Sequence, residues 1–139
     1  MMNQLYSKKV MDHFLHPCNM GEIKNPDGVA TVGNSVCGDV MRMYIKVGRR
    51  KNGRKTTEKR KEEYIKDIKF QTLGCGAAIS TSSMVTEMVK GKSLKEALKI
   101  SNKAVMVALG GLPKSKIHCS VLAEEGVKKA IEDYRKKKG

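Results

Sequence analysis

The feature that most constrains the fold is a change in the spacing of apolar residues around Gly74-Cys75-Gly76. Before this tripeptide, apolar side chains recur at every second residue, which is typical of strands buried on one face. After it, they recur at every third or fourth residue, which is typical of amphipathic helices. The chain therefore has a strand-forming part followed by a helix-forming part, and a cysteine stands at the boundary.

Three strands are expected before the boundary, at about residues 29–36, 40–47 and 64–71. The second strand has an apolar face that consists of Met41, Met43, Ile45 and Val47. The apolar face of the third strand consists of Tyr64, Ile68 and Phe70. Residues 48–63 then form a basic hairpin loop between these two strands, and residues 52–53 of it carry an Asn-Gly turn signal.

Helices account for the rest of the pattern. One is expected at residues 3–15, before the strands, and four follow them: one that ends at Gly91, and others at about 94–100, 102–109 and 119–136. Ser93 and Glu96 form a capping box for the second of these four. This order predicts an α+β fold, in which a three-stranded antiparallel meander is packed on one face by about five helices. We expect residues 1–139 to form a single domain.

The net charge of +14 is concentrated in two short segments. Residues 49–62 contribute +6, and Arg135-Lys136-Lys137-Lys138 adds four further positive charges. Runs of this kind are most often solvated loops and frayed ends. Nucleic-acid binding is the poorer interpretation, because aromatic residues make up only 4% of the chain and no nucleic-acid motif is recognisable.

The cysteines point to metal or thiol chemistry. No apolar stretch approaches the roughly 20 residues of a membrane span, and the N-terminal residues do not resemble a secretory signal. We therefore expect a cytoplasmic protein without a membrane partner, in which the four cysteines are poor candidates for disulfides. There is no C-x-x-C pair, which argues against a thioredoxin-type redox centre and against a zinc knuckle.

Three of the cysteines stand at junctions between elements. Cys37 lies at the tip of the first hairpin, Cys75 at a strand-to-helix turn and Cys119 at a loop-to-helix turn. In a meander the start of the second strand and the end of the third lie at the same end of the sheet, so Cys37 and Cys75 are expected there. Cys119 joins them if the last helix also begins at that end.

The surroundings of these cysteines favour reactive thiolates. A helix N-terminus lowers the pKa of a thiol, and this applies to Cys75 and Cys119. Exposed thiolates suit both iron ligation and attack on a persulfide. Asp39 adds a harder oxygen donor, and His118 adds either a nitrogen ligand or a proton donor to sulfur. His118 and Cys119 can both bind one cluster only if His118 still lies in the loop before the helix, because adjacent helical residues point about 100° apart. An electron-transfer cluster normally has four cysteines, so this set suits a cluster that is released.

Simpler interpretations apply to several residues. A single cysteine in such a chain is usually a buried structural thiol, but three at junctions of this kind argue for a site. Cys18 lacks that context and is interpreted as a spectator. We assign His13 and His16 to the surface or to packing, and the methionines at helical or strand spacing to the core: Met41, Met43, Met84, Met88 and Met106.

Taken together, the motifs resemble the IscU/NifU-type iron–sulfur scaffold family. They occur in the order typical of that family and cover nearly the whole chain: YSKKVMDHF at 6–14, GNSVCGD at 33–39, FQTLGCGAAIS at 70–80, ALGGLP at 108–113 and KIHCSVLA at 116–123. The resemblance implies a compact SufE/NifU-like α+β scaffold rather than an enzyme, since no substrate turnover is involved. A 2Fe–2S cluster would be ligated by Cys37, Cys75 and Cys119, with Asp39 and His118 as variable ligands, and zinc can occupy the same residues.

The resemblance also implies partners. A cysteine desulfurase would deliver sulfur, and the finished cluster would pass to apo iron–sulfur acceptor proteins. Many members carry Leu-Pro-Pro-Val-Lys for an Hsp70-type chaperone, whereas residues 112–116 read LPKSK, which puts that partner in doubt. The basic loop at 49–62 is longer than expected for the family and either contacts an acidic partner or is solvated. A homo-oligomer with a bridged cluster is compatible with the sequence, and we expect the further domains of full-length NifU to be absent.

Two other functions compete with the scaffold. A persulfide acceptor would carry sulfur without building clusters and would need only one reactive cysteine. A zinc-stabilised nucleic-acid-binding module would depend on the basic residues 49–62 and would bind with a steep salt dependence.

Overall fold

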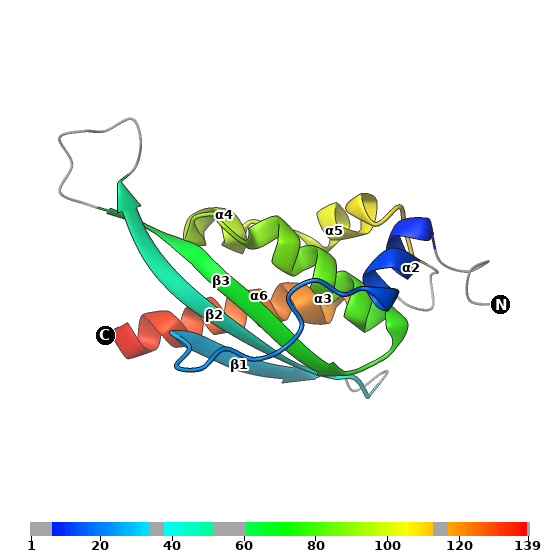
Figure 1. Ribbon diagram of the computed structural model, residues 1–139, viewed down its shortest axis with the longest axis horizontal. Helices are drawn as coiled ribbons and strands as arrows, with labels where there is room; N and C mark the ends of the chain where they lie inside the picture. Colours follow the sequence, from blue (N-terminus) through cyan, green and yellow to red (C-terminus); the bar gives the residue numbers. More distant parts are fainter. Residues whose placement is uncertain (1–6, 34–37, 52–60, 113–116, 139) are drawn as a thin grey trace.

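The three strands form an antiparallel meander, as the sequence predicts (Figure 1). The computed structural model describes residues 7–33, 38–51, 61–112 and 117–138, and only the backbone of residues 51, 61 and 118–120. Strand β1 spans Gly28–Gly33, β2 spans Val40–Lys51 and β3 spans Lys61–Leu73. The central strand β2 pairs with both others, so the sheet order follows the chain.

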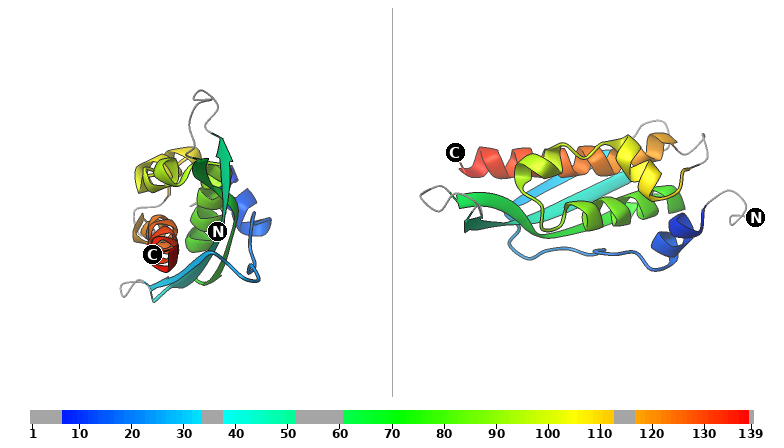
Figure 2. Two further views of the ribbon diagram at one scale, coloured as in Figure 1. Left: turned by 90° about the vertical axis from the view of Figure 1, so that its left-hand side faces the viewer. Right: turned by 90° about the horizontal axis from the view of Figure 1, so that it is seen from above.

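Five helices are described around this sheet, and the expected fold class is confirmed. They are α2 (Lys8–Leu15), α3 (Gly76–Val89), α4 (Leu94–Leu98), α5 (Asn102–Ala108) and α6 (Ile117–Lys138). Helix α6 contacts β1 and β2, α3 contacts β3, and α4 and α5 pack around α6 (Figure 2). Helix α2 packs against α3. Among the described residues, no helix combines the length and the apolar character that a membrane span requires.

The core lies between β2 and the last helix. The side chains of Met41, Met43 and Ile45 are fully buried on the predicted face of β2. The helix approaches them closely at Gly126, where an added Cβ would lie 2.8 Å from Cε of Met41. Burying each of these large side chains stabilises the fold by roughly 1.5–3 kcal/mol. Helix α6 contributes four fully buried residues to the core: Ala123, Val127, Ala130 and Ile131.

The predicted face of β3 is wrong at one position. Tyr64 was expected to share the buried face of Ile68, but Ile65 is the fully buried residue and Tyr64 is half-buried. The register of β2 against β3 shifts between Lys46 and Val47, which is a β-bulge. A bulge adds one residue to one strand, so the alternation of faces reverses beyond it.

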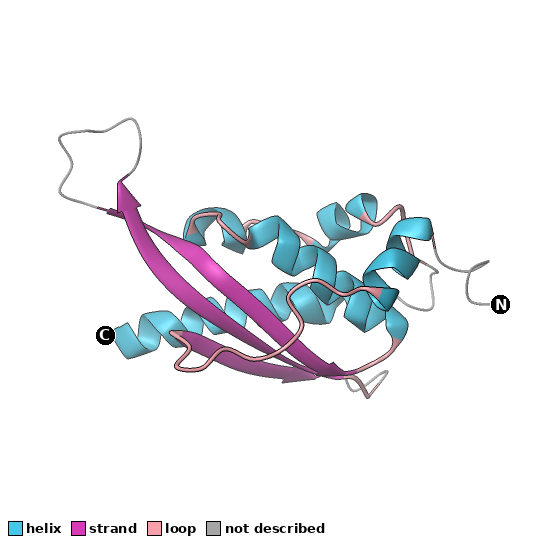
Figure 3. Cartoon of the chain, viewed as in Figure 1, coloured by secondary structure: helices cyan, strands magenta, loops and turns pink. Residues whose placement is uncertain are grey.

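The basic hairpin is more regular than expected. Residues 48–63 were predicted to form a loop, but strand pairing continues from Gly48 opposite Tyr64 to Lys51 opposite Lys61. An ion pair of 2.7 Å between Arg50 and Glu62 stabilises this extension across the two strands. The Asn-Gly signal at 52–53 lies outside the described residues. The paired ends of β2 and β3 therefore form a projecting arm where a loop was expected (Figure 3).

Local signals set most of the helix boundaries as expected. Gly91 follows α3 with a φ of +85°, in the left-handed region that favours glycine. The capping box between Ser93 and Glu96 at the start of α4 is confirmed. Two helix starts differ from the expected ones. Helix α2 begins at Lys8, with Ser7 as its N-cap, rather than at residue 3, and α6 begins at Ile117 rather than near residue 119.

Candidate functional site

The described part of the site lies where β2 begins and β3 ends. Asp39 directly precedes β2, and Cys75 directly precedes α3. Because Val40 pairs with Leu73, the residues just beyond this pair are neighbours in space. The sequence predicts that these two junctions lie at the same end of the sheet, and the positions of Asp39 and Cys75 agree with this.

Cys75 and Asp39 are in direct contact. The thiol Sγ of Cys75 donates a hydrogen bond to Oδ2 of Asp39 at 3.4 Å, and the backbone nitrogen of Cys75 lies 3.5 Å from the same oxygen. Cys75 is the N-cap residue of α3, but its side chain makes no capping hydrogen bond. Asp39 is 8% exposed and Cys75 is half-buried. A carboxylate and a thiol are thus held together at the N-terminus of α3, where the helix dipole favours an anionic ligand.

Two glycines hold this arrangement. Gly38 has a φ of +72°, a left-handed conformation in which other residues are strained. A Cβ at Gly74 would lie 2.8 Å from Cβ of Ala78 and 3.2 Å from Cγ of Asp39. The two glycines let the backbone turn and let the Asp39 carboxylate approach α3.

The other predicted ligands are only partly described. Cys37 lies outside the described residues, and only the backbone of His118 and Cys119 is described. Both of these residues lie in the first turn of α6, so the condition under which His118 and Cys119 could both bind one cluster, with His118 still in the loop, is not met. Helices α3 and α6 contact each other, and their first turns lie at the same end of the molecule (Figures 1 and 2). Within the described side chains, no group of three or more potential metal ligands is found.

Sequence reasoning missed a cluster of hydroxyl groups inside α3. Residues 80–83 are four consecutive serines and threonines, and all are buried. Oγ of Ser83 accepts a hydrogen bond from the backbone nitrogen of Cys18 at 2.7 Å and lies 2.6 Å from Nδ1 of His13. This serine therefore ties α2 and the following loop to α3. The run of small hydroxyl residues in an otherwise apolar helix was the signal for it.

The interpretation of Cys18 as a spectator stays a prediction, and the surroundings of this residue are compatible with it. A hydrogen bond to Glu87 and burial both raise the pKa of the Cys18 thiol, which therefore stays protonated at neutral pH. A protonated thiol is a poor nucleophile and a poor metal ligand. The assignment of His13 to packing agrees with its contact to Ser83.

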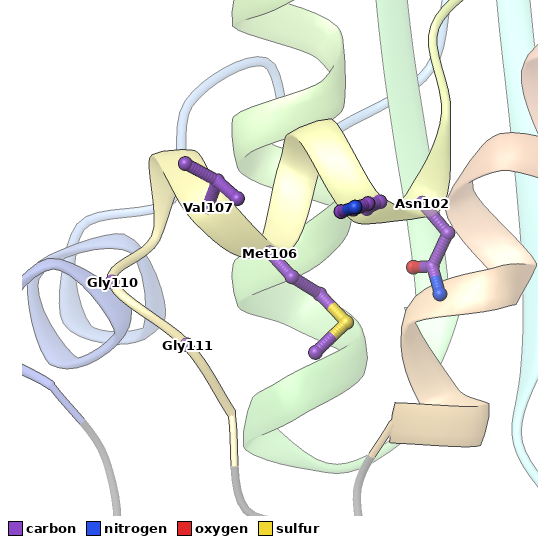
Figure 4. Close-up of a pocket in the computed structure, with 6 residues that line it drawn as sticks. Asn102, Met106, Val107, Gly110 and Gly111 are labelled. Atoms are coloured by element: carbon purple, nitrogen blue, oxygen red, sulfur yellow. The ribbon is translucent and has the colours of Figure 1, made fainter.

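A hollow lies on α5, and neither Asp39 nor Cys75 lines it. It has a volume of about 470 Å³ and is lined by Asn102, Lys103, Met106, Val107, Gly110 and Gly111 (Figure 4). Met106 is half-buried there, in contrast to its expected place in the core. The hollow is largely apolar and carries no titratable cluster, so it adds nothing to the candidate site.

Comparisons with known proteins agree with this fold. The model of the NifU-like N-terminal domain family matches residues 5–139. The chain is 56% identical over 135 residues to "Iron-sulfur cluster assembly scaffold protein IscU 1" of Archaeoglobus fulgidus, covering 97% of this chain and 80% of that protein. It is 47% identical over 136 residues to the protein named IscU of Buchnera aphidicola, covering 96% and 97% of the two chains.

A solved structure shows the same fold. The N-terminal part of a NifU-like protein from Brucella abortus superposes with a TM-score of 0.70 over 98% of each chain, at 19% identity. The family match extends over nearly the whole chain, and several relatives exceed 40% identity across it. This chain therefore belongs to the NifU-like N-terminal domain family.

Proposed function

We propose that this chain is a scaffold on which a labile 2Fe–2S cluster is assembled and from which it passes to apo-proteins. The observation that carries the proposal is the contact between the Cys75 thiol and the Asp39 carboxylate at the start of α3. The curated relatives are named as iron–sulfur cluster assembly scaffolds, which supports the same role. A scaffold holds and releases its cargo, so no substrate turnover is expected.

The spacing of the two donor atoms suits one tetrahedral metal ion. With bonds of about 2.3 Å to sulfur and about 2.0 Å to oxygen, two ligands of such an ion lie roughly 3.5 Å apart. Sγ of Cys75 and Oδ2 of Asp39 lie 3.4 Å apart. Both atoms can therefore bind the same iron, or a zinc ion in its place, with little rearrangement.

The full ligand set is part of the proposal. Cys37, Cys75 and Cys119 would bind the cluster through sulfur, and Asp39 and His118 would be the variable ligands. With His118 inside α6, it and Cys119 are successive helical residues, about 100° apart around the helix. We therefore assign the fourth position to Asp39 and give His118 a role in proton supply.

Sulfur would come from a cysteine desulfurase. A scaffold thiolate attacks the outer sulfur of the desulfurase persulfide, so a new S–S bond forms on the scaffold and the desulfurase thiolate leaves. Iron and electrons from other donors complete the cluster.

The surface beside the site suits such a partner. Val40 and Leu73 form a cross-strand pair next to Asp39 and Cys75, and they are 41% and 85% exposed. Exposed apolar side chains of this size mark a contact surface. We propose that the desulfurase covers this pair when it delivers sulfur to the site.

The remaining expectations stay predictions. The LPKSK segment that argues against an Hsp70-type chaperone falls mostly outside the described residues, at 113–116. Three further expectations also stay proposals, and the family membership is compatible with each. They are a cytoplasmic location, a single domain over residues 1–139 and a homo-oligomeric state.

Anaerobic reconstitution tests the proposed function. Native protein treated with ferrous iron and sulfide should develop the visible absorbance of an iron–sulfur cluster, and Cys75→Ala should not. Cys18→Ala is the matched control, because it removes a cysteine that the site does not use, and it should behave as the native protein does. Full colour in Cys75→Ala would contradict the proposal. Sulfur uptake without visible absorbance in the native protein would favour a persulfide carrier instead.

A further inference from the structure

Two basic segments that are far apart in the sequence meet at the end of the molecule opposite Cys75. One is the arm formed by the ends of β2 and β3, and the other is the last turn of α6 (Figures 1 and 3). Strand β2 has 12 residues and starts beside Asp39, so its far end is roughly 35 Å from the site. We call this end the basic pole and define it by Arg49, Arg50, Arg135, Lys136, Lys137 and Lys138.

The carboxylate of Glu63 connects the two segments of the basic pole. Glu63 of β3 accepts a hydrogen bond from the hydroxyl of Tyr134 and forms an ion pair of 2.9 Å with Nζ of Lys138. Arg49 of β2 lies 3.9 Å from the same carboxylate. Helix α6 continues to Lys138, so its basic end is not frayed as the sequence suggested. The two segments therefore form one surface with a defined arrangement of charges.

The charges of the pole are mixed rather than uniformly positive. Arg50 pairs with Glu62 at 2.7 Å, and Lys137 pairs with Asp133 at 3.0 Å. Arg135 and Lys136 are exposed and form no ion pair with any described residue. Alternating paired and unpaired charges fit a partner that also presents fixed charges of both kinds, because complementary patterns set the register of a protein–protein contact.

The tyrosines of this end disfavour single-stranded nucleic acid as the partner. Binding to a phosphate backbone is driven by uncompensated cations, and single strands also need aromatic rings on which bases stack. Both described tyrosines of this end are engaged. The Arg50 guanidinium covers the ring of Tyr64 at 4.4 Å, and Tyr134 is bonded to Glu63 with Lys138 over its ring.

We propose that the basic pole docks an acidic protein surface while the opposite end holds the cluster. The carboxylates of that partner would pair first with Arg135 and Lys136, the exposed cations without an ion pair among the described residues. Because the pole and the site are at opposite ends of β2, this partner and a protein at the Cys75 end can be bound at the same time. The proposal does not depend on the cluster-binding role.

Binding of an oligo-glutamate peptide tests the proposal. The peptide carries a fluorophore, and its anisotropy is measured with the full chain at about 0.02 M salt, where screening is weak. Native protein should bind it, and Arg135→Gln/Lys136→Gln should weaken binding by about fivefold. The matched control is Lys8→Gln/Lys9→Gln, which removes the same charge from exposed positions of α2 at the other end of the molecule. This control should bind as the native protein does.

Three results would overturn the proposal. The first is absence of peptide binding at low salt, and the second is equal weakening in both double variants, which would reflect net charge alone. The third is tighter, pole-dependent binding of an oligodeoxythymidine of the same net charge, which would make the partner a nucleic acid. Reconstitution of the cluster should be the same in both double variants and in the native protein, so failure here is separable from failure of the scaffold function.

Discussion

At the scale of single residues, the Asp39–Cys75 contact would link the proton of a thiol to the metal binding that we propose. Without metal, the thiol of Cys75 donates its hydrogen to the Asp39 carboxylate. When a metal binds, this proton leaves and both atoms can turn to the ion. Oxygen donors are harder than sulfur and hold a soft cluster iron less firmly. In the proposed scaffold, Asp39 would therefore be the ligand at which an acceptor can most readily begin to take the cluster.

Replacing Asp39 should prolong the life of the cluster. In Asp39→Ala the weakly held oxygen ligand is absent, so an incoming acceptor thiol loses its easiest point of attack. We expect the visible absorbance to decay several-fold more slowly after a chelator is added to the reconstituted protein. Asp12→Ala, which removes an exposed carboxylate of α2, is the control and should decay at the native rate. An unchanged lifetime in Asp39→Ala would contradict the role of a labile ligand.

Gly74→Ala should disturb the site and the fold together. The new methyl would lie 2.8 Å from Ala78 and 2.9 Å from Oγ1 of Thr72, so α3 or Asp39 must move. Overpacking of this kind costs about 1–3 kcal/mol, which urea unfolding measures. Gly33→Ala is the matched control, because its nearest neighbour would be 3.6 Å away, an ordinary contact. Similar midpoints for the two variants would contradict this account.

Some of these residue contacts follow from the sequence and others do not. The pairing of consecutive strands places Asp39 beside Cys75 without any coordinates. The bond between Ser83 and the backbone of Cys18 does not follow, because it depends on how the loop after α2 crosses α3. The position of His118 depends on where a helix starts, which a sequence defines only to within a few residues.

At the scale of elements, the regular spacing of apolar residues can be predicted from the sequence, but the places where a strand departs from that spacing cannot. The face of β2 from Met41 to Ile45 and the capping box at Ser93 are local patterns, and both are confirmed. The bulge near Val47 is not local, since it depends on the register of two strands. The length of the arm was also missed, because its residues are charged and resemble a loop. Cross-strand ion pairs such as Arg50–Glu62 stabilise strands there without an apolar face.

The Glu63 contact between β3 and α6 should make stability depend on pH. Burial alone would raise the pKa of Glu63, but the hydrogen bonds from Tyr134 and Lys138 outweigh it and lower the pKa below its ordinary value of 4.5. A lowered carboxyl pKa stabilises the fold above that ordinary value, and the contribution is lost as the pH falls through the folded-state pKa.

Glu63→Gln should therefore destabilise the protein by about 1 kcal/mol at neutral pH. The difference from the native protein should shrink as the pH falls below 4.5. Urea unfolding at a series of pH values measures both effects. Glu132→Gln is the control, because this exposed residue of α6 has only a weak ion pair, of 4.0 Å, with Lys129. A constant difference across the pH range would mean that Glu63 does not act through its charge.

At the scale of the whole molecule, the long strand β2 separates two ends with different chemistry. One end brings the starts of β2, α3 and α6 together, and the other joins the hairpin arm to the end of α6. The sequence predicts from strand order that the starts of β2 and α3 lie together, and it leaves the position of the start of α6 open. It does not predict the second arrangement, because the meeting of Glu63 with Tyr134 and Lys138 depends on the lengths of β2 and α6.

Metal binding at the cluster end should stabilise the whole molecule. Its proposed ligands come from the β1–β2 connection, the start of α3 and the start of α6, so one ion would tie three parts of the fold together. A ligand that binds only the folded state adds about 2.7 kcal/mol at a concentration of 100 times its Kd. For a domain of this size, that corresponds to a rise in Tm of roughly 5–10 °C.

Thermal unfolding followed by circular dichroism, with and without Zn²⁺ at neutral pH, measures this rise. Zinc is the suitable probe, because it binds cysteine and carboxylate ligands tetrahedrally and has no redox chemistry. Cys18→Ala should keep the rise, since its thiol is protonated and bonded to Glu87. Cys75→Ala should lose most of it, because the ion then loses its sulfur ligand at α3. An equal rise in Tm in both variants would mean that zinc binds elsewhere and that the stabilisation does not come from the proposed site.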